Sequence, residues 1–357
     1  MTINIIIIND LPHQIERGSR SMLNLKKMHH VTILGAFMIG APAFAGEVNV
    51  YSYRQPELLA PIVEGFEKQT GHKVNVLFAK DGLVERAQLE GENSQADLIL
   101  TTGVQPLVQA SELGLFATLG NLPDNLASEA VSPDNDWVGL SLRPRIFYVS
   151  KDKADVKIKT YDDVLQASLK QRFCSRPLKH VYNLSWLGGM IERRGVSETK
   201  SFLTSLQAQM ARTPQGNDRA QVQAIHEGIC DASIGNAYYY GKMLANDEQK
   251  PWADSVNLVF ATDRQGGVHV DISGAGILTN APNKEIAQEF INYALSSEAQ
   301  AIYADVNSEF PVVDGVAKPV IFDAVGAWSV SRTPLVKIAA HAKQAAMLVD
   351  EVGIDVK

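Results

Sequence analysis

The feature that most constrains the fold is an alternation of short apolar strands and amphipathic helices that begins near Gly46. In the first helical segment, residues 59–66, the apolar side chains recur at i, i+3, i+4 and i+7, and Gly71 is placed to cap its end. A further helix is expected at 197–209. Strands are expected at 48–51, 74–78, 96–101 and about 145–150. This alternation predicts an α/β protein with mainly parallel sheets covered by helices.

The length of the chain indicates more than one domain. Its 357 residues exceed one average domain but suffice for two lobes that each bury a core. No internal repeat or low-complexity linker interrupts the sequence. We therefore expect two lobes joined by extended crossovers, with a ligand cleft between them.

The N-terminus resembles a secretory signal. Lys26 and Lys27 precede an apolar run at 31–39, and an A-x-A sequence that ends at Ala45 follows. These features predict export, with cleavage near Ala45-Gly46. The apolar run is too short to span a bilayer stably.

Residues upstream of the signal form an N-terminal extension, so Met22 or Met28 could be the true start. The run 5–8 is apolar and has strand character, but its position before the signal argues against a place in the fold. We therefore leave residues 1–45 out of the predicted fold.

The charge of the chain argues against two classes of partner. The formal net charge is −7, and no basic tract or Lys/Arg-rich helix is present. A nucleic acid or an anionic membrane surface is therefore not an expected partner. The net charge is more consistent with a small ligand than with either of these partners.

Two cysteines, Cys174 and Cys230, are the only ones in the chain. In an oxidising compartment we predict that they pair. Closing a loop of about 55 residues would stabilise the fold by roughly 4 kcal/mol in the chain-entropy model. The alternative is two separate buried thiols.

Enzyme signatures are incomplete in this sequence. The phosphate-binding motif G-x-x-x-x-G-K-[ST] is missing, and the segment 271–276 is not a nucleophile elbow. In the segment 226–230, Cys230 stands where a zinc-protease helix needs its second histidine. We therefore expect a binding protein and not an enzyme.

Three consecutive tyrosines, Tyr238 to Tyr240, lie ahead of a possible helix at 242–246. A phenol has a pKa near 10, so it binds a metal only when the metal's charge drives off the proton. Fe³⁺ is hard and highly charged enough to do so. Aromatic packing is the competing explanation. If the cysteines pair, Tyr182 could face Tyr238 and Tyr239.

Several motifs distributed over the whole mature part resemble one family. They are residues 48–57 (VNVYSYRQPE), 78–82 (FAKDG), 90–94 (EGENS), 96–97 (AD), 180–185 (HVYNLS), 214–221 (PQGNDRAQ), 238–239 (YY) and 269–274 (HVDISG). The chain resembles the bacterial periplasmic ferric-ion-binding proteins, the substrate-binding components of iron ABC transporters. The resemblance implies a type II periplasmic-binding-protein fold, in which extended hinge strands join two lobes. We expect lobe 1 to comprise 46–141 plus about 264–311, and lobe 2 about 142–263 plus 312–357.

The resemblance to the three-tyrosine branch of this family also implies a metal site. It places Fe³⁺ on Tyr182, Tyr238 and Tyr239. A synergistic anion, carbonate or bicarbonate, would be held by Arg54 and Arg143, because a planar guanidinium suits bidentate anion binding. Further candidates for the cleft are Tyr53, Gln55 and Arg145, the last as a substitute for Arg143.

Two departures from the family sharpen this expectation. Gln55 stands where some relatives have a histidine, and the segment 101–103 carries no carboxylate where some relatives supply one. The resemblance further implies a periplasmic monomer that delivers iron to an ABC-transporter permease in the inner membrane. The alternative is a protein of the same fold that binds an organic or oxyanion solute directly through Arg54 and Arg143.

Overall fold

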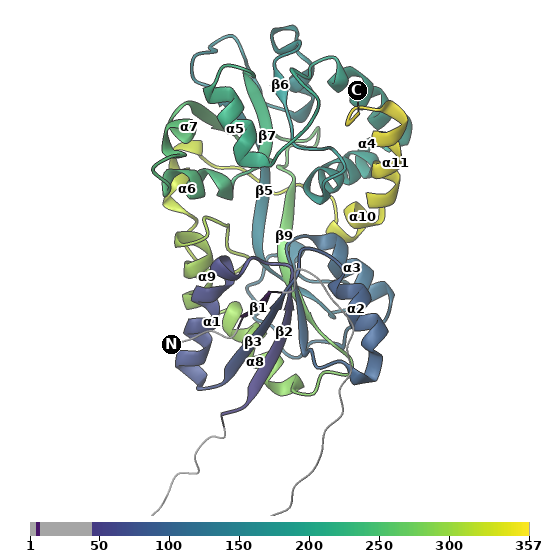
Figure 1. Ribbon diagram of the computed structural model, residues 1–357, viewed down its shortest axis with the longest axis vertical. Helices are drawn as coiled ribbons and strands as arrows, with labels where there is room; N and C mark the ends of the chain where they lie inside the picture. The colour runs from purple at the N-terminus through teal and green to yellow at the C-terminus, as the bar shows by residue number, and fades with distance from the viewer. Residues whose placement is uncertain (1–4, 8–44, 357) are drawn as a thin grey trace, which may run out of the picture.

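The computed structural model describes residues 5–7 and 45–356. Two lobes are stacked along the long axis of the molecule and are joined by the strands β5 (Val138–Ser150) and β9 (Val270–Ile277) (Figure 1). The α/β fold with two lobes and extended hinge strands that we predicted from the sequence is therefore confirmed. The signal sequence and its cleavage site fall mostly outside the described residues.

Lobe 1 is built on parallel strand pairs. Strand β2 lies between β3 and β4 and is parallel to both, while β9 runs antiparallel to β4. The strands are β2 (Glu47–Ser52), β3 (Lys73–Phe78) and β4 (Leu98–Thr101). The helices of this lobe are α1 (Pro56–Thr70), α2 (Leu83–Glu90), α3 (Val104–Glu112), α8 (Lys284–Ala294) and α9 (Ser297–Asp305).

The N-terminal extension contributes one strand that the sequence prediction left out. Strand β1 (Ile5–Ile7) pairs in parallel with β3, and Ile5 lies opposite Val76. The physical reason is that β3 has β2 on only one side, so its other edge offers unpaired backbone groups to an apolar, β-branched segment.

Lobe 2 contains a mixed sheet. Strands β7 and β8 run antiparallel to β5, and β6 runs parallel to β7. The strands are β6 (Phe173–Cys174), β7 (Ala232–Asn236) and β8 (Val256–Val259). The helices are α4 (Val181–Gln207), α5 (Asp218–His226), α6 (Tyr238–Leu244), α7 (Lys250–Asp254), α10 (Leu335–Ala340) and α11 (Ala342–Val352).

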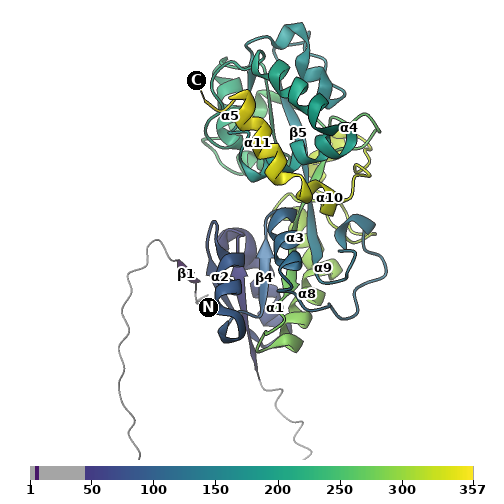
Figure 2. The ribbon, with the colours of Figure 1, turned by 90° about the vertical axis from the view of Figure 1, so that its right-hand side faces the viewer.

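Short 3-10 helices complete the secondary structure. They are η1 (Gly91–Asn93), η2 (Ser128–Ala130), η3 (Tyr161–Leu165), η4 (Ala167–Leu169) and η5 (Val320–Val325). Helix α10 lies at the waist of the molecule, where it packs against α3 and α4 (Figure 2). Within the described residues, no helix is both long enough and apolar enough to cross a membrane.

Strand β5 serves both lobes. Its residues Val138–Pro144 pair with β9, and Arg145–Ser150 pair with β7 or β8. Side chains two residues apart share one face of a strand. Arg143 and Arg145 therefore lie on the same face of β5, at the point where the strand passes from one lobe to the other.

Helix α1 illustrates how the sequence pattern becomes packing. The four apolar residues of the predicted stripe, Leu59, Ile62, Val63 and Phe66, are all buried. Burying each such side chain stabilises the fold by about 1.5–3 kcal/mol. Gly71 caps the helix with a left-handed φ of 76°, as predicted.

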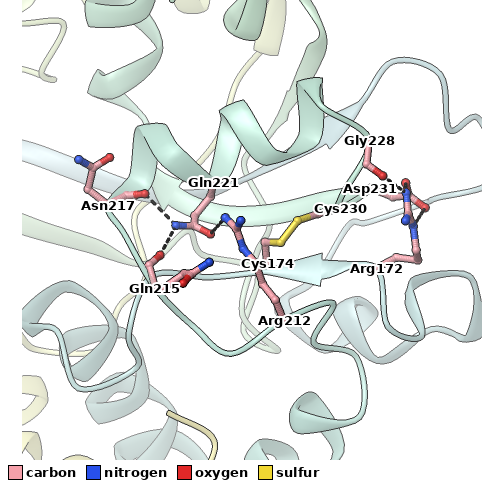
Figure 3. The surroundings of a disulfide bond; sticks show 9 residues. All are labelled: Arg172, Cys174, Arg212, Gln215, Asn217, Gln221, Gly228, Cys230 and Asp231. Carbon is pink, nitrogen blue, oxygen red and sulfur yellow. Dashed lines mark hydrogen bonds and ion pairs between the residues drawn. A yellow bond between two sulfur atoms is a disulfide. The ribbon is translucent and has the colours of Figure 1, made fainter. Parts of the chain in front are cut away.

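The predicted disulfide between Cys174 and Cys230 is present, with a Cα–Cα distance of 5.9 Å (Figure 3). It joins β6 to the segment just before β7. On one side of it Arg172 Nη2 lies 2.6 Å from Asp231 Oδ1. Because β6 leads to α4 and β7 leads to α6, the disulfide fixes the starting points of the two segments that carry the candidate tyrosines.

Candidate metal centre

The candidate tyrosines lie in the first turns of two helices. His180 caps α4, and its Nδ1 accepts a hydrogen bond from the backbone N of Tyr182 at 3.3 Å. Helix α6 begins at Tyr238 itself, so the prediction that this helix starts at 242 is wrong. The reason is that Ala237 already has helical φ and ψ and Tyr238 is buried, so packing holds the tyrosines in the helix.

The structure brings the three phenols together. The hydroxyl oxygens of Tyr182 and Tyr238 lie 3.5 Å apart. The rings of Tyr238 and Tyr239 lie against each other, with 4.2 Å between their centroids. The sequence prediction that Tyr182 faces Tyr238 is therefore matched by the geometry.

The guanidinium of Arg143 lies among these phenols. Its Nη2 donates to the hydroxyls of Tyr182 at 3.2 Å and Tyr238 at 2.7 Å. Its Nη1 donates to the backbone carbonyl of Thr102, which follows β4. Arg143 thus connects the phenols of lobe 2 with a loop of lobe 1, and it places a positive charge beside the hydroxyls of Tyr182 and Tyr238.

The three phenols differ in acidity. Burial alone would raise the pKa of Tyr182, but the positive charge of Arg143 and hydrogen bonds from Tyr238 and Arg143 outweigh it, so this pKa is lowered. Burial raises the pKa of Tyr238 well above its usual value. Burial, together with the neighbouring Tyr182, raises the pKa of Tyr239 to about 12. Tyr182 is therefore the first of the three to ionise.

Arg54, the other predicted anion-binding arginine, is joined to Arg143 through a carboxylate. Arg54 Nη1 donates to Ser273 Oγ at 2.8 Å and to Glu309 Oε2 at 3.1 Å. Glu309 Oε1 lies 3.7 Å from Arg143 Nε. The sequence analysis missed Glu309, and no local motif could have found it, because it lies 255 residues from Arg54.

Arg145, the predicted substitute for Arg143, is engaged elsewhere. Its Nη1 donates to Asp218 Oδ2 at 2.7 Å and to Asn236 Oδ1 at 2.9 Å. Its Nη2 donates to Asn183 Oδ1 at 2.6 Å. Arg145 therefore braces the starts of α4 and α5 and the end of β7, which precedes α6.

Arg176, which the sequence analysis missed, is the second arginine beside Asp218. Arg176 Nη1 lies 3.3 Å from Asp218 Oδ1, and its guanidinium carbon lies 5.0 Å from the ring centroid of Tyr182. Arg176, which is paired with Asp218, thus packs against the Tyr182 ring. The proximity of Arg176 to Cys174 in the sequence is the one signal that could have suggested it.

The remaining candidates lie in lobe 1, apart from the phenols. The hydroxyl of Tyr53 accepts a hydrogen bond from the backbone N of Val84 at 2.9 Å, at the start of α2. Gln55 is exposed and stands at the N-cap of α1. Within the described part of the chain, neither side chain hydrogen-bonds to the three phenols.

The donor set limits which metal can bind. Among residues 5–7 and 45–356, no group of three or more His, Cys, Asp or Glu side chains is placed to hold a metal ion. A metal bound beside Arg143 would therefore depend on phenol oxygens, which bind when deprotonated by an ion of high charge.

Comparison with known proteins assigns the chain to a family. The model of the bacterial extracellular solute-binding protein family matches residues 62–328. The chain belongs to this family. This solute-binding protein is 33% identical to iron uptake protein A1 of Synechocystis over 318 residues, covering 87% of its own chain and 88% of the relative.

Solved structures agree with this assignment. The apo ferric ion-binding protein A of Pasteurella haemolytica has a TM-score of 0.83 and 42% identity, over 87% of this chain and 99% of that one. A Trichodesmium protein in complex with iron and citrate has a TM-score of 0.81 and 34% identity, over 87% of this chain and 100% of that one. The resemblance to ferric-ion-binding proteins and the type II fold predicted from the sequence are confirmed.

Proposed function

We propose that this solute-binding protein captures Fe³⁺ between its lobes on the phenolate oxygens of Tyr182, Tyr238 and Tyr239. The observation that carries the proposal is the convergence of the Tyr182 and Tyr238 hydroxyls on the guanidinium of Arg143, with their oxygens 3.5 Å apart and the Tyr239 ring lying against that of Tyr238. Similarity to proteins named for iron uptake and ferric-ion binding supports the choice of metal.

Charge balance explains how the phenols would accept the ion. Without iron, Arg143 supplies a positive charge to Tyr182 and Tyr238. Fe³⁺ has a charge high enough to drive the protons off Tyr238 and Tyr239 despite their raised pKa values. Three tyrosinates would cancel the charge of the ion, and the guanidinium of Arg143 would then be released to another anion.

That anion would complete the coordination of the iron. We propose carbonate or bicarbonate, held by Arg143 with Arg54 behind it, because a guanidinium can donate two parallel hydrogen bonds to a planar oxyanion. The citrate bound with iron in the Trichodesmium relative shows that an external anion can accompany the metal in that protein.

The proposal includes the route of the iron. The chain would be exported to the periplasm by its N-terminal signal, cleaved near Ala45-Gly46, and would act there as a monomer. Its lobes, with the boundaries expected from the sequence, would close on the ion. The closed form would then deliver iron to an ABC-transporter permease in the inner membrane.

A visible spectrum tests the proposal. Ferric citrate added to the purified mature protein with bicarbonate should produce a charge-transfer band, because tyrosinate bound to Fe³⁺ absorbs visible light. Tyr238→Phe should remove or strongly shift the band. Tyr240→Phe is the matched control, since Tyr240 is a half-buried neighbouring phenol outside the cluster.

Two results would contradict tyrosinate ligation. One is the lack of any band with the wild-type protein, which would favour the alternative, a binding site for an organic or oxyanion solute that uses Arg54 and Arg143 directly. The other is an iron affinity that does not change with pH. Because ligation releases protons, the affinity should fall about tenfold per pH unit for each proton released as the pH is lowered.

A further inference from the structure

We infer that Glu309 sets the net charge of the anion site and thereby its preference for a singly charged oxyanion over a doubly charged one. The inference rests on the proposed function and deepens it, because it concerns which anion accompanies the iron. We call Arg54, Glu309 and Arg143 together the hinge triad.

The first support is the position of the carboxylate. Phe310 N donates to Leu142 O at 3.0 Å, and Leu142 N donates to Phe310 O at 2.7 Å. This pair of backbone hydrogen bonds fixes Glu309 beside β5. Its Oε2 also accepts a hydrogen bond from Ser141 Oγ at 2.5 Å. The Glu309 carboxylate is therefore held at the hinge beside Ser141, which precedes Arg143 by two positions in β5.

The second support is burial. Arg54 is 1% exposed, Arg143 is 3% exposed and Glu309 is 1% exposed. In such surroundings charges are weakly screened, so each one strongly affects the others. Two guanidiniums and one carboxylate leave the hinge triad with one net positive charge.

The third support is that Glu309 is ionised. Burial would raise the pKa of Glu309, but the charges of Arg54 and Arg143 and the hydrogen bond from Ser141 outweigh it, so the pKa is lowered. Glu309 thus cancels one arginine charge throughout the neutral range.

The contacts within the triad leave the terminal nitrogens of Arg143 to other partners, which are Thr102, Tyr182 and Tyr238. Arg143 Nε and Glu309 Oε1 are 3.7 Å apart, and neither atom has a hydrogen-bond partner among the described residues. The carboxylate therefore attracts Arg143 by charge without taking up its guanidinium donors. Arg54, by contrast, is tied by hydrogen bonds to Glu309 and Ser273. Glu309 acts here as a positioning residue and not as a ligand.

The test measures how the ferric charge-transfer band depends on the anion. The iron-loaded mature protein is titrated at pH 7 with bicarbonate, a monoanion, and separately with sulfate, a dianion. Glu309→Gln should lower the half-saturating bicarbonate concentration at least about fivefold. Glu309→Gln should lower the half-saturating sulfate concentration by a larger factor, because a dianion gains twice the electrostatic attraction. An unchanged ratio between the two anions would overturn the inference.

A matched control uses a second buried carboxylate. Asp263 Oδ2 accepts a hydrogen bond from Ser331 Oγ at 2.5 Å and lies 3.5 Å from Arg193 Nη1. This set has the same chemistry but shares no residue with the proposed site. Asp263→Asn should leave both anion titrations unchanged, and an equal shift there would show that any buried carboxylate has this effect.

A charge-rescue cycle keeps the inference testable if Glu309→Gln does not fold. Arg54→Gln should weaken bicarbonate binding at least about tenfold. The double variant Arg54→Gln with Glu309→Gln removes both members of an ion pair, which buried sites tolerate better than removal of one. It should bind bicarbonate within about threefold of wild type. A double variant as weak as Arg54→Gln would overturn the inference.

Failure of the inference is distinguishable from failure of the proposed function. A wild-type protein that develops no ferric band would overturn the proposed function and the inference with it. A wild-type protein with a normal band, whose Glu309→Gln variant responds to both anions as wild type does, would overturn only the role of Glu309.

Discussion

The phenol cluster is flanked by two buried sets of charges with the same composition and different geometry. Each set holds two arginines and one carboxylate. They are the hinge triad of Arg54, Glu309 and Arg143, and a lobe 2 triad of Arg145, Asp218 and Arg176. In the lobe 2 triad the carboxylate reaches both arginines at 3.3 Å or less, whereas in the hinge triad one arginine remains 3.7 Å away.

This difference makes the lobe 2 triad a fixed scaffold and the hinge triad the more adjustable of the two. Asp218 also accepts a hydrogen bond from the backbone N of Asn236 at 2.9 Å, so its oxygens are fully used. Glu309 leaves Oε1 without a hydrogen-bond partner among the described residues. The lobe 2 triad therefore holds the helix starts that carry the tyrosines. In the hinge triad Glu309 attracts Arg143 by charge alone, and the terminal nitrogens of Arg143 donate to Tyr182, Tyr238 and Thr102 instead.

Removal of the lobe 2 carboxylate should have the largest effect on stability. Asp218→Asn leaves Arg145 and Arg176 without their counter-charge inside the protein, and we expect a loss of about 3 kcal/mol in the free energy of unfolding. Urea denaturation followed by circular dichroism measures it. Glu351→Gln, which removes an exposed ion pair with Lys200, should cost less than about 0.5 kcal/mol. If Glu309→Gln costs as much stability as Asp218→Asn, the distinction between the two triads is wrong.

A buried histidine beside the lobe 2 triad should make stability depend on pH. Burial and the charges of Arg193 and Arg145 hold the pKa of His269 well below its usual value. The unfolded chain therefore binds a proton near pH 6.5 that the folded chain does not, and stability is lost as the pH falls below that value. Between pH 7 and 5 we expect His269 to account for about 2 kcal/mol.

Urea denaturation of wild type and His269→Gln at both pH values measures this contribution. Subtracting the pH dependence of the free energy of unfolding of His269→Gln from that of wild type removes the contributions of the other titratable groups. An identical loss of stability in both proteins between pH 7 and 5 would show that His269 is not responsible.

The smallest effect should come from Tyr53, which the sequence analysis placed as a possible cleft residue. Tyr53→Phe removes the acceptor for the backbone N of Val84, and we expect a loss of about 1 kcal/mol in the free energy of unfolding. The ferric charge-transfer band should not change. A lost or shifted band in this variant would place Tyr53 with the phenol cluster and extend the site into lobe 1.

The local pattern of the sequence predicted the elements that depend on local periodicity. Helix α1 is such a case, because its apolar stripe and its capping glycine lie within one segment. Strand β5 was predicted only from 145, although it begins at Val138. The seven residues before 145 are buried on both faces, so they lack the alternation that identifies a half-buried strand.

The candidate site likewise contains some residues that the sequence predicted and others that only the folded chain brings together. Tyr182, Tyr238 and Tyr239 were predicted from recognisable motifs, Arg143 was predicted from the family resemblance, and the structure brings these four residues together. The carboxylates that position the arginines were not found. Asp218 lies 73 residues from Arg145, and Glu309 lies 168 residues from Ser141, so only the folded chain makes these neighbours.

The disulfide also has a consequence for how the protein can be followed during its life in the cell. Because Cys174 and Cys230 are the only cysteines of the chain, their redox state is a single, unambiguous signal. A molecule that has remained in a reducing compartment carries two thiols that a maleimide can label once the chain is unfolded, whereas an oxidised molecule carries none. Thiol labelling under denaturing conditions would therefore count the fraction of molecules that have formed the disulfide.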